Sequence, residues 1–151
     1  MKKRSERLDV VQQVAARAEQ ERAKRVGDAE RHLADMQDKL QALEKYRGEY
    51  EAGFAKRAGS GVDVVGMRDF QTFMAKLAEA LGQQRELVAL ARSALEAQRT
   101  HWREAAQRSH VVDTLAERWQ GEENRAALRR DQQESDELSQ QQRPNIRERN
   151  S

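Results

Sequence analysis

The stretch from Tyr46 to Phe73, YRGEYEAGFAKRAGSGVDVVGMRDFQTF, divides two long runs rich in charged residues, Gln and Ala. It holds five of the eight glycines and five of the seven aromatic residues. At its centre, residues 57–66 read RAGSGVDVVG. Gly59 and Gly61 disfavour a continued helix there and allow the positive φ angles of a chain reversal. The sequence therefore predicts a break between two helices.

The residues before the break have the spacing of a coiled coil. Apolar side chains recur in alternating steps of three and four, as at the a and d positions of a heptad. These positions are Val26, Ala29, Leu33, Met36, Leu40, Leu43, Arg47, Tyr50 and Phe54, of which only Arg47 is not apolar. Leu8, Val11, Ala15, Ala18 and Arg22 continue the spacing toward the N-terminus. An extra step of four from Arg22 to Val26 indicates a stutter, which locally relaxes the supercoil.

A second seam follows the break and keeps the same alternation. Its positions are Met67, Phe70, Met74, Leu77, Leu81, Gln84, Val88, Ala91, Leu95, Gln98, Trp102, Ala105, Ser109, Val112, Ala116 and Trp119. Ser60 and Asp63 resemble a capping box before this helix, although Gly66 weakens its first turn. We predict a first helix over about residues 5–57, a loop over about 58–63 and a second helix over about 64–138.

Two matched seams around one short break favour an all-α fold: a long antiparallel two-helix coiled coil, or helical hairpin, with the second helix longer than the first. A parallel dimer of straight chains through the break is the alternative. Folding about residue 61 pairs residue i with roughly residue 122 − i. Leu8 then lies near Asp113 or Thr114, and the second helix projects beyond the first from about residue 116. We predict that residues 1–142 form a single domain and that residues 143–151 form a disordered tail.

The composition excludes several classes of function. Lys and Arg number 28 against 26 Asp and Glu, and the signs mostly alternate, as on solvated helix faces. The chain has no cysteine and therefore no disulfide or thiol chemistry. No apolar stretch follows the basic N-terminus, so we expect no signal peptide. No run approaches the roughly 18 apolar residues of a membrane span. These features predict a cytoplasmic protein.

Catalysis, cofactors and metals are not expected either, because a two-helix coiled coil offers no deep pocket. GSGVDVVG lacks the lysine of a phosphate-binding loop. His101 with Glu104, and His110 with Asp113, are spaced as ordinary surface pairs or a weak metal site. The helices lack a continuous basic stripe with interleaved aromatics, so nucleic acid is not an expected partner. Protein–protein contact remains as the function.

Several motifs follow one another in the order of a known family. They are LxxYRxEY at residues 43–50, FQTFMAKLAEALGQQ at 70–84, HWREA at 101–105 and ENRAALRRDQQESDEL at 123–138. Together they resemble the FliJ family, the small stalk protein of the bacterial flagellar type III export apparatus. The resemblance implies an antiparallel coiled coil without catalysis that binds the ring of the flagellar export ATPase and promotes its assembly and activity. It also implies contacts with the cytoplasmic domain of the export-gate membrane protein and with export chaperones, at the cytoplasmic face of the inner membrane.

The resemblance further implies two sets of contact residues. An exposed patch near the loop carries the gate contact in this family, and Gln84 stands where the family often has histidine. The matching positions are Leu43, Tyr46, Tyr50, Phe73, Leu77, Ala80 and Gln84. Tyr50, Phe54 and Phe70 fill the seam beside the turn. The alternative for Tyr46 and Phe73, which lie outside it, is that they lean over the seam and cap it.

By analogy with a rotary stalk, the paired helix ends enter the ATPase ring, and their basic residues face acidic loops there. The first 25 residues carry eight Lys and Arg against four acids, which is either a basic patch or an ordinary solvated helix start. The candidate ring contacts are Arg4, Arg7, Arg17, Arg22, Lys24, Arg25, Arg92, Arg99 and Arg103. An injectisome-type secretion stalk, and a generic coiled-coil scaffold or substrate chaperone, are the alternative functions.

Overall fold

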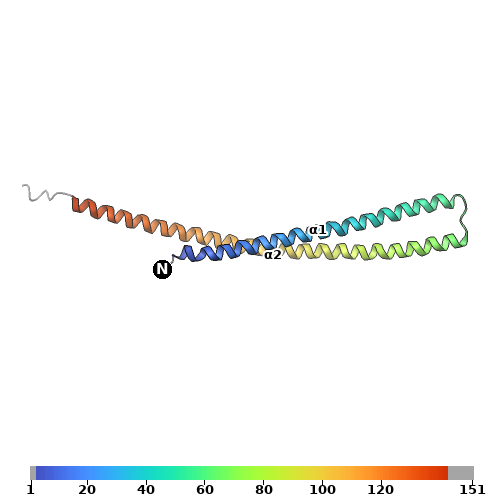
Figure 1. The fold of residues 1–151 in the computed structure, drawn as a ribbon, viewed down its shortest axis with the longest axis horizontal. Coiled ribbons are helices and arrows are strands. Elements are labelled where there is room, and N and C mark those ends of the chain that lie inside the picture. The colour runs from blue at the N-terminus through green and yellow to red at the C-terminus, as the bar shows by residue number, and fades with distance from the viewer. Residues whose placement is uncertain (1–2, 143–151) are drawn as a thin grey trace, which may run out of the picture. The chain divides into compact units, whose positions relative to one another are not determined.

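The computed structural model describes residues 3–142, so the tail predicted over residues 143–151 lies outside the described residues. Helix α1 spans Arg4–Ala58, helix α2 spans Val64–Gln142, and residues 59–63 connect them. The two helices pack against each other in opposite directions (Figure 1). The prediction of an all-α helical hairpin with a longer second helix is therefore confirmed.

The connection reverses the chain at Gly61, which has a φ angle of 96°. Asp63 caps α2, because its Oδ1 atom accepts a hydrogen bond of 2.7 Å from the Gly66 amide. The predicted capping box that begins at Ser60 is wrong, since Asp63 itself occupies the N-cap position. A Cβ atom at Gly66 would lie 2.9 Å from Val62 Cγ1. Glycine therefore leaves room for the cap in the first turn.

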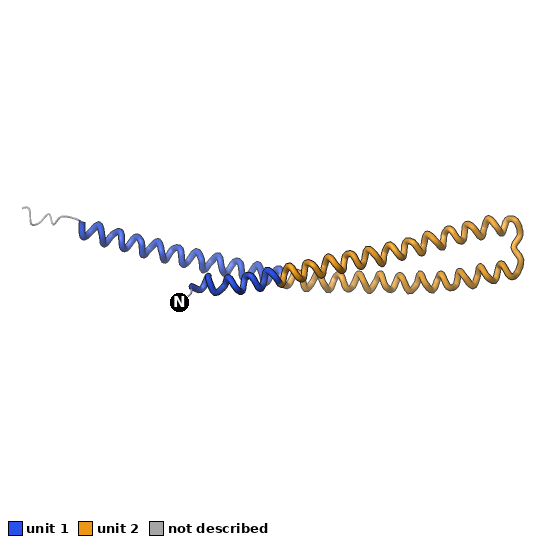
Figure 2. Tube along the Cα trace, in the orientation of Figure 1, with its two compact units in different colours: residues 1–17, 106–151 blue, residues 18–105 orange. Residues whose placement is uncertain are grey.

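The chain divides into two compact units (Figure 2). We call residues 18–105 the loop unit, because they include the connection between the helices. We call the described residues up to 17 and from 106 onward the terminal unit. Each unit contains a segment of α1 and a segment of α2.

The core of the loop unit is a narrow seam. Met36, Val88 and Ala91 form a buried cluster on which Leu33 and Leu40 pack. Buried positions continue along α2 at Leu77, Leu81, Gln84 and Leu95. Each buried aliphatic side chain contributes about 1.5–3 kcal/mol relative to an exposed one. The two helices of this unit thus pack against each other along the seam predicted in α2.

The start of α1 differs from the predicted pattern by one residue. Val11 is 47 % exposed, whereas Gln12 is half-buried and donates a hydrogen bond of 3.0 Å to Asp113. Ala18 is likewise exposed, and Glu19 is half-buried. With Gln12 and Glu19 in the seam, the steps of three and four continue without interruption. The predicted stutter is therefore wrong.

The pairing of residues in the terminal unit is also shifted. Ser5 contacts Glu123, and Gln12 contacts Asp113, so Leu8 lies between these two levels rather than against Asp113. α2 accordingly pairs with α1 as far as Glu123, beyond the predicted limit near residue 116. Side chains lean toward the N-terminus of their own helix. In an antiparallel pair, contacting residues therefore lie further along both chains than symmetric folding predicts.

Candidate partner-binding surfaces

Five aromatic rings from α1 and α2 interlock beside the loop. Phe54 stacks on Phe70 with ring centroids 3.8 Å apart, and Phe70 stacks on Tyr50 at 5.7 Å. Phe73 lies 4.2 Å from Tyr50 and meets Tyr46 edge-on at 5.9 Å. Such pairs contribute about 0.5–1.5 kcal/mol each beyond the burial of their area. We call these five rings the aromatic cluster. In it, Tyr46 and Phe73 join the three rings that occupy seam positions, Tyr50, Phe54 and Phe70.

The residues of the predicted gate patch differ in how accessible they are. Leu77 and Gln84 are only 6 % and 8 % exposed. Gln84 Nε2 donates a hydrogen bond of 2.9 Å to the Met36 carbonyl oxygen. Tyr46, in contrast, is 49 % exposed. The half-buried members are Leu43, Tyr50, Phe73 and Ala80. A partner that approaches this patch therefore meets Tyr46 and the edges of its neighbours, while Leu77 and Gln84 support the patch from the seam.

Two of the predicted ring-contacting arginines line a shallow groove in the loop unit. The groove is formed by Ala23, Val26, Gly27, Glu30, Arg99, Trp102 and Arg103. The small side chains from α1 leave Trp102 36 % exposed although it occupies a seam position. Arg99 forms ion pairs with Glu96 at 2.8 Å and with Glu30 at 3.8 Å. Its guanidinium is therefore partly engaged within the hairpin.

The remaining predicted ring contacts lie elsewhere. Arg22 is half-buried in the seam of the loop unit, and Arg92 is exposed on α2 of the same unit. Arg7 and Arg17 are exposed in the terminal unit. The groove thus unites Arg99 and Arg103, but it does not include the other seven candidates, of which Arg4, Lys24 and Arg25 are also exposed.

The beginning of α1 is held by carboxylates of α2. The Arg4 guanidinium lies 4.6 Å from the centroid of the Trp119 ring and 3.1 Å from Glu122 Oε2. The Ser5 amide donates a hydrogen bond of 3.3 Å to Glu123, and the Ser5 hydroxyl donates another to the same carboxylate. These hydrogen bonds, aided by nearby basic side chains, lower the pKa of Glu123, although burial acts in the opposite direction. Glu123 thus satisfies a helix N-terminus from the neighbouring helix.

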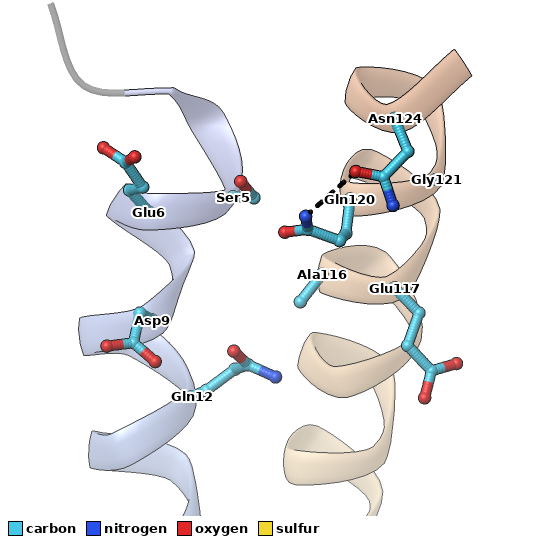
Figure 3. A pocket seen from close by; sticks show the side chains of 9 residues that line it. All are labelled: Ser5, Glu6, Asp9, Gln12, Ala116, Glu117, Gln120, Gly121 and Asn124. Carbon is cyan, nitrogen blue, oxygen red and sulfur yellow. Dashed lines mark hydrogen bonds between the residues drawn. The ribbon is translucent and has the colours of Figure 1, made fainter. Parts of the chain in front are cut away.

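Figure 3 shows one side of the terminal unit, where polar side chains of both helices border an open groove. Its residues are Ser5, Glu6, Asp9, Gln12, Ala116, Glu117, Gln120, Gly121 and Asn124. Within the groove, Gln120 donates a hydrogen bond of 3.3 Å to Asn124. Three of the nine residues are carboxylates and none is Lys or Arg, so we call this side the acidic groove. Sequence reasoning missed it because alternating charges along a chain can still segregate on a helix face.

Among residues 3–142, no group of three or more His, Asp or Glu side chains is arranged to hold a metal ion. His101 Nδ1 lies 3.8 Å from Glu104, as in an ordinary surface pair. Neither described helix has a segment long and apolar enough to cross a membrane.

The hairpin, its single seam and its exposed polar and aromatic surfaces define an antiparallel coiled-coil protein of the kind that acts through contacts with other proteins. The family described as Flagellar FliJ protein matches residues 3–146. The chain therefore belongs to the FliJ family and is a component of the flagellar export apparatus, in a family that is not enzymatic. No curated protein and no solved structure matches this chain significantly.

Proposed function

We propose that this protein is a stalk-like regulator that binds the flagellar export ATPase and promotes the assembly and activity of its ring. One observation carries the proposal: the family match extends over both helices of the hairpin, from residue 3 to residue 146. A long, narrow coiled coil with many exposed charged side chains suits a protein that is held within a ring. Exposed Arg7 and Arg17 are candidates for pairing with acidic loops of that ring.

The test is ATP hydrolysis by the flagellar export ATPase of the same organism, measured with and without this protein while ring size is followed by sedimentation. We expect added protein to promote ring formation and to raise the rate. If neither ring size nor rate changes, the regulatory role is overturned.

Charge-reversing variants make this test specific. We expect the double variant Arg7→Glu/Arg17→Glu to stimulate less, with the largest difference at low salt, because exposed charges are screened beyond about 8 Å at physiological ionic strength. The matched control is Lys45→Glu/Lys56→Glu, which reverses two exposed charges in the loop unit. Equal losses in both variants would indicate a general effect of net charge.

We further propose that Tyr46 and the adjoining edge of the aromatic cluster contact the cytoplasmic domain of the export-gate protein. Tyr46 is 49 % exposed while its ring packs edge-on against Phe73, so it offers a fixed aromatic surface. Tyr is over-represented among the residues that contribute most to protein–protein binding. Such a contact would hold the protein at the cytoplasmic face of the inner membrane.

Pull-down with the purified gate domain tests this contact. We expect Tyr46→Ser to abolish binding while helical content is retained. Leu77→Asp is unsuitable as a probe, because it would place a charge at a position that is 6 % exposed. Phe54→Leu is the control, since Phe54 belongs to the cluster but not to the predicted patch. Retained binding by Tyr46→Ser would overturn the assignment.

Handling of export chaperones belongs to the same proposal, and family membership supports it. The described surfaces do not favour one chaperone over another. Co-purification with each export chaperone of the organism would identify the cargo, and the absence of any complex would remove this part of the proposal.

A further inference from the structure

The two sides of the terminal unit differ in charge. The acidic groove presents Glu6, Asp9 and Glu117 and contains no basic residue. Arg4 and Glu122 do not line this groove; each immediately precedes a seam residue, Ser5 and Glu123, and the two form an ion pair of 3.1 Å. Positions that flank a coiled-coil seam alternate between its two sides, so each side has its own set of facing residues.

The ion pair between Arg4 and Glu122 fixes which residues face each other on the side away from the acidic groove. One heptad further along α1 and one heptad back along α2, the same geometry recurs, and it places Val11 opposite Leu115. Val11 is 47 % exposed and Leu115 is half-buried. Further exposed apolar residues adjoin this pair: Val10 at 63 %, Val14 at 63 % and Val111 at 57 %.

We call these five apolar residues the valine face. Four arginines lie three or four residues from members of the face on the same helix and therefore border it: Arg7, Arg17, Arg108 and Arg118. Arg4 also flanks the face, but its charge is engaged by Glu122. Glu122, which flanks the face on α2, is already paired with Arg4. The face is therefore an apolar centre with a basic border.

The three most exposed members of the valine face, Val10, Val14 and Val111, contribute little to the packing of the hairpin itself. Val is β-branched and a weaker helix former than the Ala, Glu, Lys and Arg that occupy most exposed positions of this chain. Val10 and Val14 contribute little to the seam at 63 % exposure each. Clustered exposed apolar residues with a polar border are characteristic of a surface that another molecule covers.

We infer that the valine face is the surface by which this protein engages the export ATPase, through an ATPase segment whose apolar side chains are bordered by Asp and Glu. This inference rests on the proposed function. The apolar centre supplies affinity, and the arginine border selects an acidic partner and accelerates encounter. The acidic groove on the opposite side stays free of such a segment, so the contact with the ATPase is one-sided.

The charges favour this occupant over two others. A second copy that presented its own valine face would set one arginine border against another. A second copy that presented its acidic groove would match the charge but would supply carboxylates and amides in place of apolar cover. An anionic membrane also suits an apolar, basic surface, but helices that lie in membranes usually insert bulky Leu, Phe or Trp side chains rather than Val.

The test measures binding of the full-length chain to the purified export ATPase of the same organism near physiological salt. The variant is Val10→Ser/Val14→Ser/Val111→Ser, and Ser is no worse than Val in a helix, so folding is preserved. The control is Leu90→Ser, at a side chain of α2 that is 67 % exposed in the loop unit. We expect the triple variant to bind about tenfold or more weakly and the control to bind like the wild type.

The outcomes separate this inference from the function on which it rests. Absence of wild-type binding would overturn both, whereas equal binding by wild type and triple variant would overturn the valine face alone. Two further measurements address the other occupants: sedimentation of the chain alone, and co-sedimentation with phosphatidylglycerol-containing vesicles. If ATPase binding is unchanged and the triple variant instead loses self-association or vesicle binding, the face belongs to that occupant and the inference is wrong.

Discussion

The contact between Ser5 and Glu123 links the first turn of α1 to α2 through hydrogen bonds from both the amide and the hydroxyl of one residue. A carboxylate at a helix N-terminus is favoured by the unpaired amides and by the helix dipole. Because the contact joins residues far apart in sequence, it closes the hairpin at its terminal end. The protonation state of Glu123 therefore affects the stability of the first turn of α1.

The lowered pKa of Glu123 predicts a pH dependence of this closure. A depressed carboxyl pKa means that the folded state favours the charged form, so the stabilisation is present above the ordinary glutamate pKa of 4.5 and is lost as the pH falls through the folded value. We expect Ser5→Ala to raise the pKa of Glu123 toward its ordinary value. An NMR titration of the Glu123 carboxyl in both proteins checks this, and identical titration curves would show that the hydrogen bond from the Ser5 hydroxyl does not control the pKa.

The reversal at Gly61 leads to a second prediction at a single residue. Its φ angle of 96° is unfavourable for any residue with a Cβ atom, so Gly61→Ala should destabilise the hairpin by about 1 kcal/mol. Gly82 is the matched control, because it lies within α2 and a Cβ there would have no neighbour within 4 Å. Gly82→Ala should stabilise by about 0.5–1 kcal/mol. Urea unfolding followed by circular dichroism measures both, and a shift of the same sign in the two variants would contradict the prediction.

At the scale of the helix, the seam contains polar residues with different surroundings. Gln84 donates a hydrogen bond to the Met36 carbonyl oxygen. Gln98 Oε1 is buried and has no hydrogen-bond partner. A buried acceptor without a partner costs about 1–3 kcal/mol, whereas a satisfied one costs little. The two glutamines therefore weaken the coiled coil to different extents.

We predict that Gln98→Leu stabilises the hairpin, by about 1–3 kcal/mol, because it removes the unsatisfied acceptor and adds apolar burial. Gln84→Leu should stabilise it less or destabilise it, since the hydrogen bond to Met36 is lost. Urea unfolding of both variants gives the comparison. A larger gain for Gln84→Leu would show that Gln98 is satisfied in solution.

The helices and their main seam followed from the sequence because apolar spacing and the glycine-rich break both predicted a hairpin. The seam at the start of α1 could not be predicted in this way, since the polar Gln12 lies in the seam while the apolar Val11 beside it is exposed. Assigning the more apolar neighbour to the seam produced a stutter that is absent from the helix. The misplaced Val11 belongs to the valine face, so the error in the pattern coincides with the candidate binding surface.

The candidate sites were less predictable for a related reason. Spacing places Leu77 and Gln84 in the seam, but the family resemblance placed them in a partner patch, and only burial distinguishes a supporting residue from an accessible one. The acidic groove and the valine face each combine residues of α1 and α2 from distant parts of the sequence. Finding them requires the pairing of the two helices, and symmetric folding about residue 61 misjudged that pairing by about one helical turn.

For the molecule as a whole, the hairpin topology itself can be tested in solution, because the chain has no cysteine to interfere with engineered ones. Gln12 and Asp113 contact each other at 3.0 Å between their side chains, so Gln12→Cys/Asp113→Cys places two thiols within reach of a short bismaleimide. We expect a cross-link within one chain, detected as a monomer that carries the mass of one linker and as a linked peptide pair after digestion. Gln12→Cys alone is the control and should give no cross-linked product at low protein concentration. A covalent dimer of the single variant Gln12→Cys would instead support parallel association of straight chains, and the surfaces defined by the pairing of α1 with α2, including the valine face, would then not exist.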